Sequence, residues 1–208
     1  MARTRVKICG ITRPEDGRMA AAAGADAIGL VFHPDSPRAV SPERAAEICA
    51  ALPPFVTAVG LFVDPAREQV ERTLAACPLD LLQFHGGEAP EFCAAFGRRY
   101  LKAVRVGAET DLAAAAARYG ADRLLLDAYV PGQAGGTGRS FNWALIPADL
   151  ASRVVLAGGL DAENVGEAVR AVGPYAVDAS SGVEEGPGVK SAARVKAFIQ
   201  GVRDADRG

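Results

Sequence analysis

Three side chains that can transfer protons stand at the ends of separate apolar runs: Cys9, His85 and Asp127. Asp127 ends an apolar run in which a carboxylate is costly unless it reaches the rim or a partner, so we interpret it as an acid or base. A helix N-cap is the alternative. Lys7 precedes Cys9 by two residues and shares its face of a strand, so its ammonium group favours the thiolate. A purely packing role for Cys9 stays open. We expect His85 and Gly136 among the substrate-binding residues, and whether His85 acts as proton carrier, hydrogen-bond donor or rim residue stays open.

Two segments rich in glycine and serine have the composition of an anion-binding site. AGGL contains Gly158 and Gly159, and DASSGVE contains Ser180, Ser181 and Gly182. Backbone N–H groups of such segments converge on a phosphate, although the same glycines also serve tight turns without a ligand. Because the two segments follow successive apolar runs, the sequence favours a phosphate site.

Two further loop segments carry residues that suit ligand binding, SPR at 36–38 and GGTG at 135–138. Arg38 offers a guanidinium fork for a substrate carboxylate, and a solvated loop arginine is the alternative. The glycines around Gly136 suit the hinges of a mobile lid, but a solvated loop without function has the same composition. The sequence alone does not decide between a lid and a loop without function for GGTG.

Short apolar runs must position these residues, and most are continuous in Val, Ile, Leu and Ala, as in parallel strands covered on both faces. The runs occupy residues 6–9, 27–32, 56–63, 79–84, 101–106, 123–127, 154–157 and 175–178. Segments with helical spacing separate them. Thr12 and Glu15 have the spacing of a capping box, and Ser41-Pro42 and Asp64-Pro65 each place a capping side chain before a proline. Asp161 and Ser191 offer caps for two later helices.

Eight strand-helix units without a linker predict an α/β fold, a single-domain (β/α)8 TIM barrel over residues 1–208. A doubly wound open sheet is the alternative, but the early GxGxxG loop typical of that fold is absent from the sequence. In a barrel, the C-terminal ends of the strands converge on one mouth. The reactive residues are therefore expected to share that mouth.

Composition narrows the classes of partner. The chain has 23 basic and 25 acidic residues without a basic stripe, so we expect no nucleic-acid partner. The four cysteines form no CxxC pair and no histidine spacing completes a zinc site, so we expect no metal. A secretory signal and a membrane-spanning stretch are also missing, which predicts a cytoplasmic protein with reduced thiols and no membrane contact.

In combination, these motifs resemble those of the phosphoribosylanthranilate isomerase family. They are KICGIT, SPR, GLFV, QFHGGE, LLLDA, GGTGRSFNW, AGGL and DASSGVEEGPGVK, in that order along nearly the whole chain. The resemblance implies a cofactor-free Amadori rearrangement of a sugar-phosphate substrate, N-(5-phosphoribosyl)anthranilate, in tryptophan biosynthesis. It assigns Cys9 as general base, Asp127 as general acid, Arg38 to the anthranilate carboxylate, and the glycines of AGGL and the SSG segment to the phosphate.

These roles set opposite requirements on two pKa values. We expect a nearby cation to help ionise Cys9 and apolar surroundings to raise the pKa of Asp127, which predicts a bell-shaped pH profile of kcat/KM. Two rival functions stay open: a histidine-pathway aminoaldose isomerase, which uses two aspartates, and a phosphate-binding barrel without catalysis. The oligomeric state is likewise open between monomer and homodimer.

Overall fold

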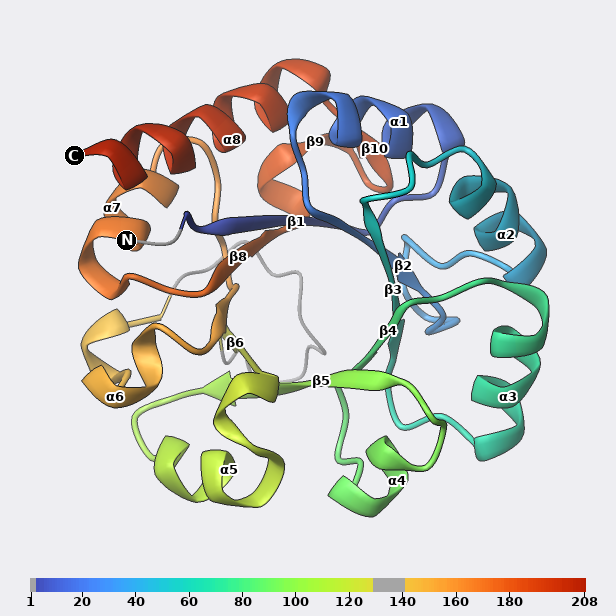
Figure 1. The fold of residues 1–208 in the computed structure, drawn as a ribbon, viewed down its shortest axis with the longest axis horizontal. Coiled ribbons are helices and arrows are strands. Elements are labelled where there is room, and N and C mark those ends of the chain that lie inside the picture. Colours follow the sequence, from blue (N-terminus) through green and yellow to red (C-terminus); the bar gives the residue numbers. More distant parts are fainter. Residues whose placement is uncertain (1–2, 129–140) are drawn as a thin grey trace.

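The computed structural model describes residues 3–128 and 141–208, in which eight parallel strands close into a barrel (Figure 1). The strands are β1 (Arg5–Cys9), β2 (Ala27–Val31), β3 (Thr57–Phe62), β4 (Leu81–Phe84), β5 (Arg99–Val106), β6 (Leu124–Ala128), β7 (Val155–Leu156) and β8 (Ala176–Ala179). Each strand pairs with the next, and β8 pairs with β1, so the sheet has no free edge. All eight predicted strands are confirmed to within two residues at each end, and closure excludes the open sheet.

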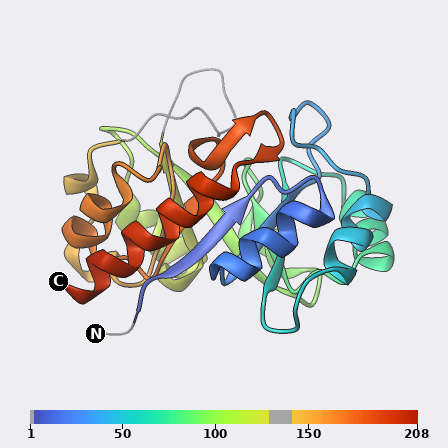
Figure 2. The same ribbon diagram turned by 90° about the horizontal axis from the view of Figure 1, so that it is seen from above.

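Helices surround the barrel and connect its strands (Figure 1). They are α1 (Pro14–Ala23), α2 (Pro42–Ala50), α3 (Arg67–Ala76), α4 (Pro90–Ala94), α5 (Leu112–Tyr119), α6 (Ala148–Ala151), α7 (Val165–Val172) and α8 (Ala192–Arg207). A short hairpin of β9 (Glu184–Gly186) and β10 (Val189–Lys190) follows β8, at the end of the barrel opposite the chain termini (Figure 2). Within the described ranges, no helix has the length and apolar character to cross a membrane.

Two of the five predicted helix caps, at Ser41 and Ser191, are confirmed. The hydroxyls of these two serines accept hydrogen bonds from the first turns of α2 and α8. The predictions for Thr12 and Asp161 are wrong, because α1 and α7 have Arg13 and Asn164 at their cap positions.

The prediction for Asp64 is also wrong, because α3 begins later, with Ala66 at its cap position. The Asp64 carboxylate instead accepts a hydrogen bond from the backbone N–H of Gly87 at 2.6 Å. Asp64 therefore joins the loop after β3 to the loop after β4.

Alternation along each strand separates an outer apolar core from an inner one. On β6, Leu124 and Leu126 belong to the cluster between barrel and helices, while Leu125 belongs to a smaller cluster with inward-facing residues of other strands. All three leucines are fully buried, and each contributes about 1.5–3 kcal/mol of apolar burial. Asp127 lies two residues beyond Leu125 and therefore also faces inward, above an apolar floor.

Candidate active site

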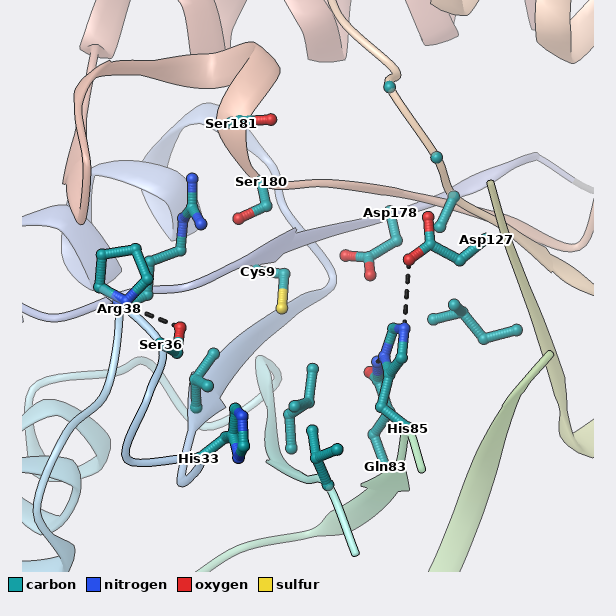
Figure 3. Close-up of a pocket in the computed structure, with 18 of the residues that line it drawn as sticks. Cys9, His33, Ser36, Arg38, Gln83, His85, Asp127, Asp178, Ser180 and Ser181 are labelled. Atoms are coloured by element: carbon teal, nitrogen blue, oxygen red, sulfur yellow. Dashed lines mark hydrogen bonds and ion pairs between the residues drawn. The ribbon is translucent and has the colours of Figure 1, made fainter. Parts of the chain in front are cut away.

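A cavity of about 610 Å³ opens where the barrel strands end (Figure 3). Its wall includes eight of the predicted site residues, namely Cys9, Arg38, His85, Asp127, Gly158, Gly159, Ser180 and Ser181. Gly136 and the rest of the GGTG segment lie outside the described residues. Gly182 is not part of the wall; an added Cβ there would come within 2.2 Å of the Leu160 carbonyl oxygen, so it packs against the loop after β7.

β1 and β2 together place Cys9 in the cavity wall. Ile8 packs fully buried in the outer core, so Lys7 and Cys9 on either side of it face the barrel interior. Gly29 on β2 provides the space for the thiol, since a Cβ at that position would lie 2.6 Å from the Cys9 Sγ. The sulfur thus faces the cavity from a largely buried position.

A buried ion pair lies beside this thiol. Lys7 Nζ is 2.8 Å from Asp178 Oδ2, and the two side chains are only 5% and 8% exposed. Burial raises the pKa of Cys9, the Lys7 and Lys190 ammonium groups lower it, and the Asp178 carboxylate raises it further. The net effect is a raised pKa of Cys9. The predicted influence of Lys7 has the expected sign, but burial outweighs it, because a thiolate loses more hydration than the cations restore.

Asp127 belongs to a hydrogen-bonded chain that crosses from β6 to β4. Its Oδ2 lies 3.1 Å from His85 Nε2, and Gln83 Nε2 lies 3.2 Å from His85 Nδ1 (Figure 3). With Gln83 donating to Nδ1, a neutral imidazole carries its proton on Nε2 and donates to the Asp127 carboxylate. Asp127 Oδ1 accepts from the N–H of Ala128, which lies in the same strand, so these contacts are not those of a helix cap. The structure thereby gives His85 a specific partner.

The loops after β7 and β8 bring backbone N–H groups to the same rim. Gly158 and Gly159 have φ values of 85° and 62°, a region that favours glycine, and an added Cβ at Gly158 would lie 2.6 Å from the Ala128 nitrogen. The N–H groups of Gly158, Gly159 and Ser180 donate to no acceptor within residues 3–128 and 141–208. The glycines therefore make a tight turn that also presents unpaired donors, as an anion site requires.

Arg38 is not a solvated loop residue, since its side chain is 14% exposed. Its Nε and Nη2 donate to the two carboxylate oxygens of Glu184 at 2.8 and 2.7 Å. Lys190 Nζ donates to Glu184 Oε1 at 2.7 Å and to the Ser180 carbonyl at 3.1 Å. This network fixes the guanidinium on the side of the cavity where Ser180 lies (Figure 3).

Sequence reasoning missed four polar residues of this region: Gln83, Asp178, Glu184 and Lys190. Asp178 carried the same signal as Asp127, a carboxylate at the end of an apolar strand, and could have been found by it. Glu184 and Lys190 lie in a hairpin too short to show any periodicity. Their importance depends on a contact with a distant loop.

The closed barrel, with side chains that can transfer protons at its C-terminal mouth, has the architecture of a (β/α)8-barrel enzyme. Comparison with known sequences then specifies the family. A model of the N-(5'-phosphoribosyl)anthranilate (PRA) isomerase family matches residues 6–201, and the chain belongs to that family.

Individual relatives match this chain over nearly its full length. The N-(5'-phosphoribosyl)anthranilate isomerase of Pseudomonas aeruginosa (strain UCBPP-PA14) is 58% identical over 208 residues, which are 100% of this chain and 99% of that protein. A crystal structure of phosphoribosyl anthranilate isomerase in complex with reduced 1-(o-carboxyphenylamino)-1-deoxyribulose 5-phosphate is 40% identical, with a TM-score of 0.84 and coverage of 97% and 99%. Monomers of the dimeric isomerase from Thermotoga maritima are 38% identical, with the same TM-score of 0.84 and coverage of 97% and 99%. The family indicated by the motifs is confirmed.

Proposed function

We propose that this chain catalyses the Amadori rearrangement of N-(5'-phosphoribosyl)anthranilate to 1-(2-carboxyphenylamino)-1-deoxyribulose 5-phosphate, a step of tryptophan biosynthesis, with Cys9 as general base and Asp127 as general acid. Membership of the isomerase family supports the activity. The observation that carries the two residue roles is that a thiol from β1 and a carboxyl group from β6 line one cavity. Two groups on separate strands can serve two proton transfers on one bound substrate.

The first transfer opens the ring. Asp127 gives a proton to the ring oxygen while the bond from that oxygen to C1 breaks, and the nitrogen lone pair forms an iminium. The Cys9 thiolate then removes the proton on C2, whose bonding electrons form a C1–C2 double bond and neutralise the nitrogen. The enolamine gains a proton at C1, loses the proton of its C2 hydroxyl and becomes the ketone. Oxidation at C2 balances reduction at C1, and each positioned transfer typically contributes about 10²–10⁴-fold.

His85 can hydrogen-bond to Asp127 in both protonation states that these reaction steps require. When the carboxylate is ionised, His85 Nε2–H donates to it, as described above. When the carboxyl group is protonated, Nε2 accepts and Nδ1–H donates to Oε1 of a Gln83 amide turned by half a rotation. That oxygen has no hydrogen-bond partner among the described residues, so the turn breaks no other contact of Oε1. The pair supports an acid that both releases and regains a proton.

The two anionic ends of the substrate suit two parts of the rim. The N–H groups of Gly158, Gly159 and Ser180, which have no acceptor among the described residues, suit the phosphate. We assign Ser181, which lines the cavity, to the same phosphate site, and Gly182 to the tight packing of that loop against the loop after β7. The Arg38 guanidinium suits the anthranilate carboxylate. Holding both ends confines the open-chain sugar, so binding energy from remote groups lowers the barrier at C1 and C2.

The wider setting of this function follows from the same observations. We infer one catalytic domain, because the elements from β1 to α8 build a single barrel. The four cysteines are free, which supports a reducing cytoplasm, and a small-molecule substrate needs no nucleic-acid or membrane partner. The Thermotoga maritima relative is described as dimeric, so monomer and homodimer both stay open for this chain, and light scattering of the purified protein distinguishes them.

A direct assay tests the proposed activity. Purified protein is mixed with freshly made N-(5'-phosphoribosyl)anthranilate, and the loss of anthranilate fluorescence is followed. We expect a loss that is saturable in substrate and proportional to the protein concentration. Absence of turnover by a protein that still binds inorganic phosphate contradicts the proposal and favours a barrel without catalysis.

A further inference from the structure

We propose that Glu184 is a positioning residue that holds Arg38 ready for the carboxylate end of the substrate, while Lys190 preserves the positive charge of that position. The inference rests on the proposed function, in which Arg38 binds the anthranilate carboxylate. It adds two residues that do not line the cavity.

The geometry of the fork leaves one edge of the guanidinium free. Glu184 takes the edge formed by Nε and Nη2, at 2.8 and 2.7 Å. Nη1 of Arg38 makes no hydrogen bond to any described residue. Since a guanidinium has five N–H donors, the Nη1–Nη2 edge still offers two parallel donors to a second carboxylate. Arg38 thus has one edge for the protein and one for a ligand.

Packing holds the aliphatic part of the Arg38 side chain (its stem) in place, as Glu184 holds the guanidinium. A Cβ added to Gly10 would lie 2.5 Å from Arg38 Cδ and 3.0 Å from Ser180 Oγ, so the stem crosses the residue that follows Cys9. The Arg38 N–H also donates to the Ser36 hydroxyl at 3.2 Å. An arginine held at both ends has lost most of its rotamer freedom before the substrate arrives, which favours tight binding.

The charges of the cluster explain why a third residue is present. Glu184 alone would cancel the charge of Arg38 and leave little attraction for a substrate carboxylate. Lys190, whose side chain is 0% exposed, adds a second cation at 2.7 Å from Glu184 Oε1, so the trio in its ionised form carries one net positive charge. Burial lowers the pKa of Lys190, and the hydrogen bond to Glu184 opposes that shift. Burial raises the pKa of Glu184, but Arg38 and Lys190 outweigh it and hold that pKa below its ordinary value. Glu184 therefore remains ionised and keeps its two hydrogen bonds to Arg38.

The same contacts connect the two ends of the substrate site. Lys190 also donates to the carbonyl of Ser180, whose N–H belongs to the proposed phosphate site. The chain Arg38, Glu184, Lys190, Ser180 thus links the loop before α2 to the loop after β8 through the β9–β10 hairpin. Such a link sets the separation between carboxylate and phosphate positions.

A double-mutant cycle in the full-length enzyme tests whether Glu184 acts through Arg38. We expect Glu184→Gln to raise KM about tenfold while kcat changes about twofold or less, and Arg38→Ala to raise KM at least as much. The double variant is expected to match Arg38→Ala alone. An unchanged KM in Glu184→Gln, or an equal further rise when it is added to Arg38→Ala, overturns the inference.

An inhibitor pair separates positioning from general damage. Reduced 1-(o-carboxyphenylamino)-1-deoxyribulose 5-phosphate and the same compound without its carboxyl group differ only at the group that Arg38 should bind. We expect the ratio of their inhibition constants to shrink in Glu184→Gln and in Lys190→Met, whereas a merely loosened fold would weaken both compounds alike. An unchanged ratio in either variant contradicts the role proposed for that residue.

A surface fork provides the matched control. Arg153 Nε and Nη2 donate to Asp122 at 2.8 and 3.3 Å in an exposed position away from the cavity. Asp122→Asn is expected to leave KM and the inhibitor ratio unchanged, and a change equal to that of Glu184→Gln would contradict a specific effect. If the wild-type enzyme does not turn over, the proposed function fails; if it does and the cycle shows no coupling, only the role of Glu184 fails.

Discussion

The two sides of the cavity control their proton-transferring groups by different means. On the β1 side, the pKa of Cys9 results from a balance in which burial opposes the cations of Lys7 and Lys190. On the β6 side, Asp127 is held by two hydrogen bonds, one with His85 Nε2 at 3.1 Å and one from the Ala128 N–H at 2.9 Å. Burial and nearby charges therefore set the pKa of the proposed base, whereas hydrogen bonds hold the proposed acid in place. Substitutions on the two sides should therefore change different kinetic quantities.

The largest effects are expected from removing the two groups themselves. Cys9→Ser replaces the thiol by a hydroxyl that scarcely ionises, and Asp127→Asn removes the transferable proton. Each change should lower kcat by about 10²–10⁴-fold while the circular dichroism spectrum and melting temperature stay close to those of the wild type. Steady-state kinetics with N-(5'-phosphoribosyl)anthranilate measure this, and near-normal turnover in either variant rejects that residue's role.

Removing the hydrogen-bond partner of the proposed acid should lower kcat by a smaller factor. His85→Asn removes the hydrogen bond to Asp127, and a bond to a charged group is worth about 1.5–3 kcal/mol, so kcat should fall roughly 10–100-fold. KM should change little, because His85 is assigned to the acid rather than to substrate binding. A raised KM with unchanged kcat would instead assign His85 to substrate binding.

Altering the charges beside the base should move the pH profile rather than abolish activity. The base must be ionised, so kcat/KM rises about tenfold per pH unit below the pKa of Cys9, which is shifted upward. Lys7→Met removes a cation that lowers this pKa and should move the rising limb to higher pH. Asp178→Asn removes an anion that raises it and should move the limb to lower pH. Shifts in the same direction would disprove the charge-balance account.

The smallest effect is expected from a thiol outside the cavity. Cys49 Sγ and Cys77 Sγ lie 3.5 Å apart between α2 and the end of α3, and neither lines the cavity. Cys49→Ser should leave kcat, KM and the rising pH limb unchanged and alter the free energy of unfolding by about 1 kcal/mol. A shifted limb in this variant would mean that Cys9 is not the thiol that controls the profile.

The fold was predictable from the sequence because strands buried on both faces consist of continuous apolar runs. The same rule brought Cys9 and Asp127 together, since residues at the C-terminal ends of barrel strands converge on one mouth. Family resemblance then supplied roles that the residue types alone left open, such as base for Cys9 and carboxylate binding for Arg38.

The contacts that sequence could not supply join residues far apart in the chain. Arg38 and Glu184 are 146 positions apart, and no local pattern predicts their fork. The failed cap at Asp64 has the same cause: a tertiary hydrogen bond to Gly87 replaced the local one expected before a proline. The direction of the Cys9 pKa was missed because burial of a strand-end thiol depends on how closely β2 approaches it, here through Gly29.

The measurement closest to the central claim compares Cys9 ionisation with catalysis. The rate of Cys9 alkylation by iodoacetamide is determined across pH by mass spectrometry of the Cys9 peptide, alongside the pH dependence of kcat/KM. If Cys9 is the base, both curves give the same pKa, above the roughly 8.5 of an unperturbed thiol. A rising kinetic limb at a different pH from alkylation, or one that survives in Cys9→Ser, would contradict the account.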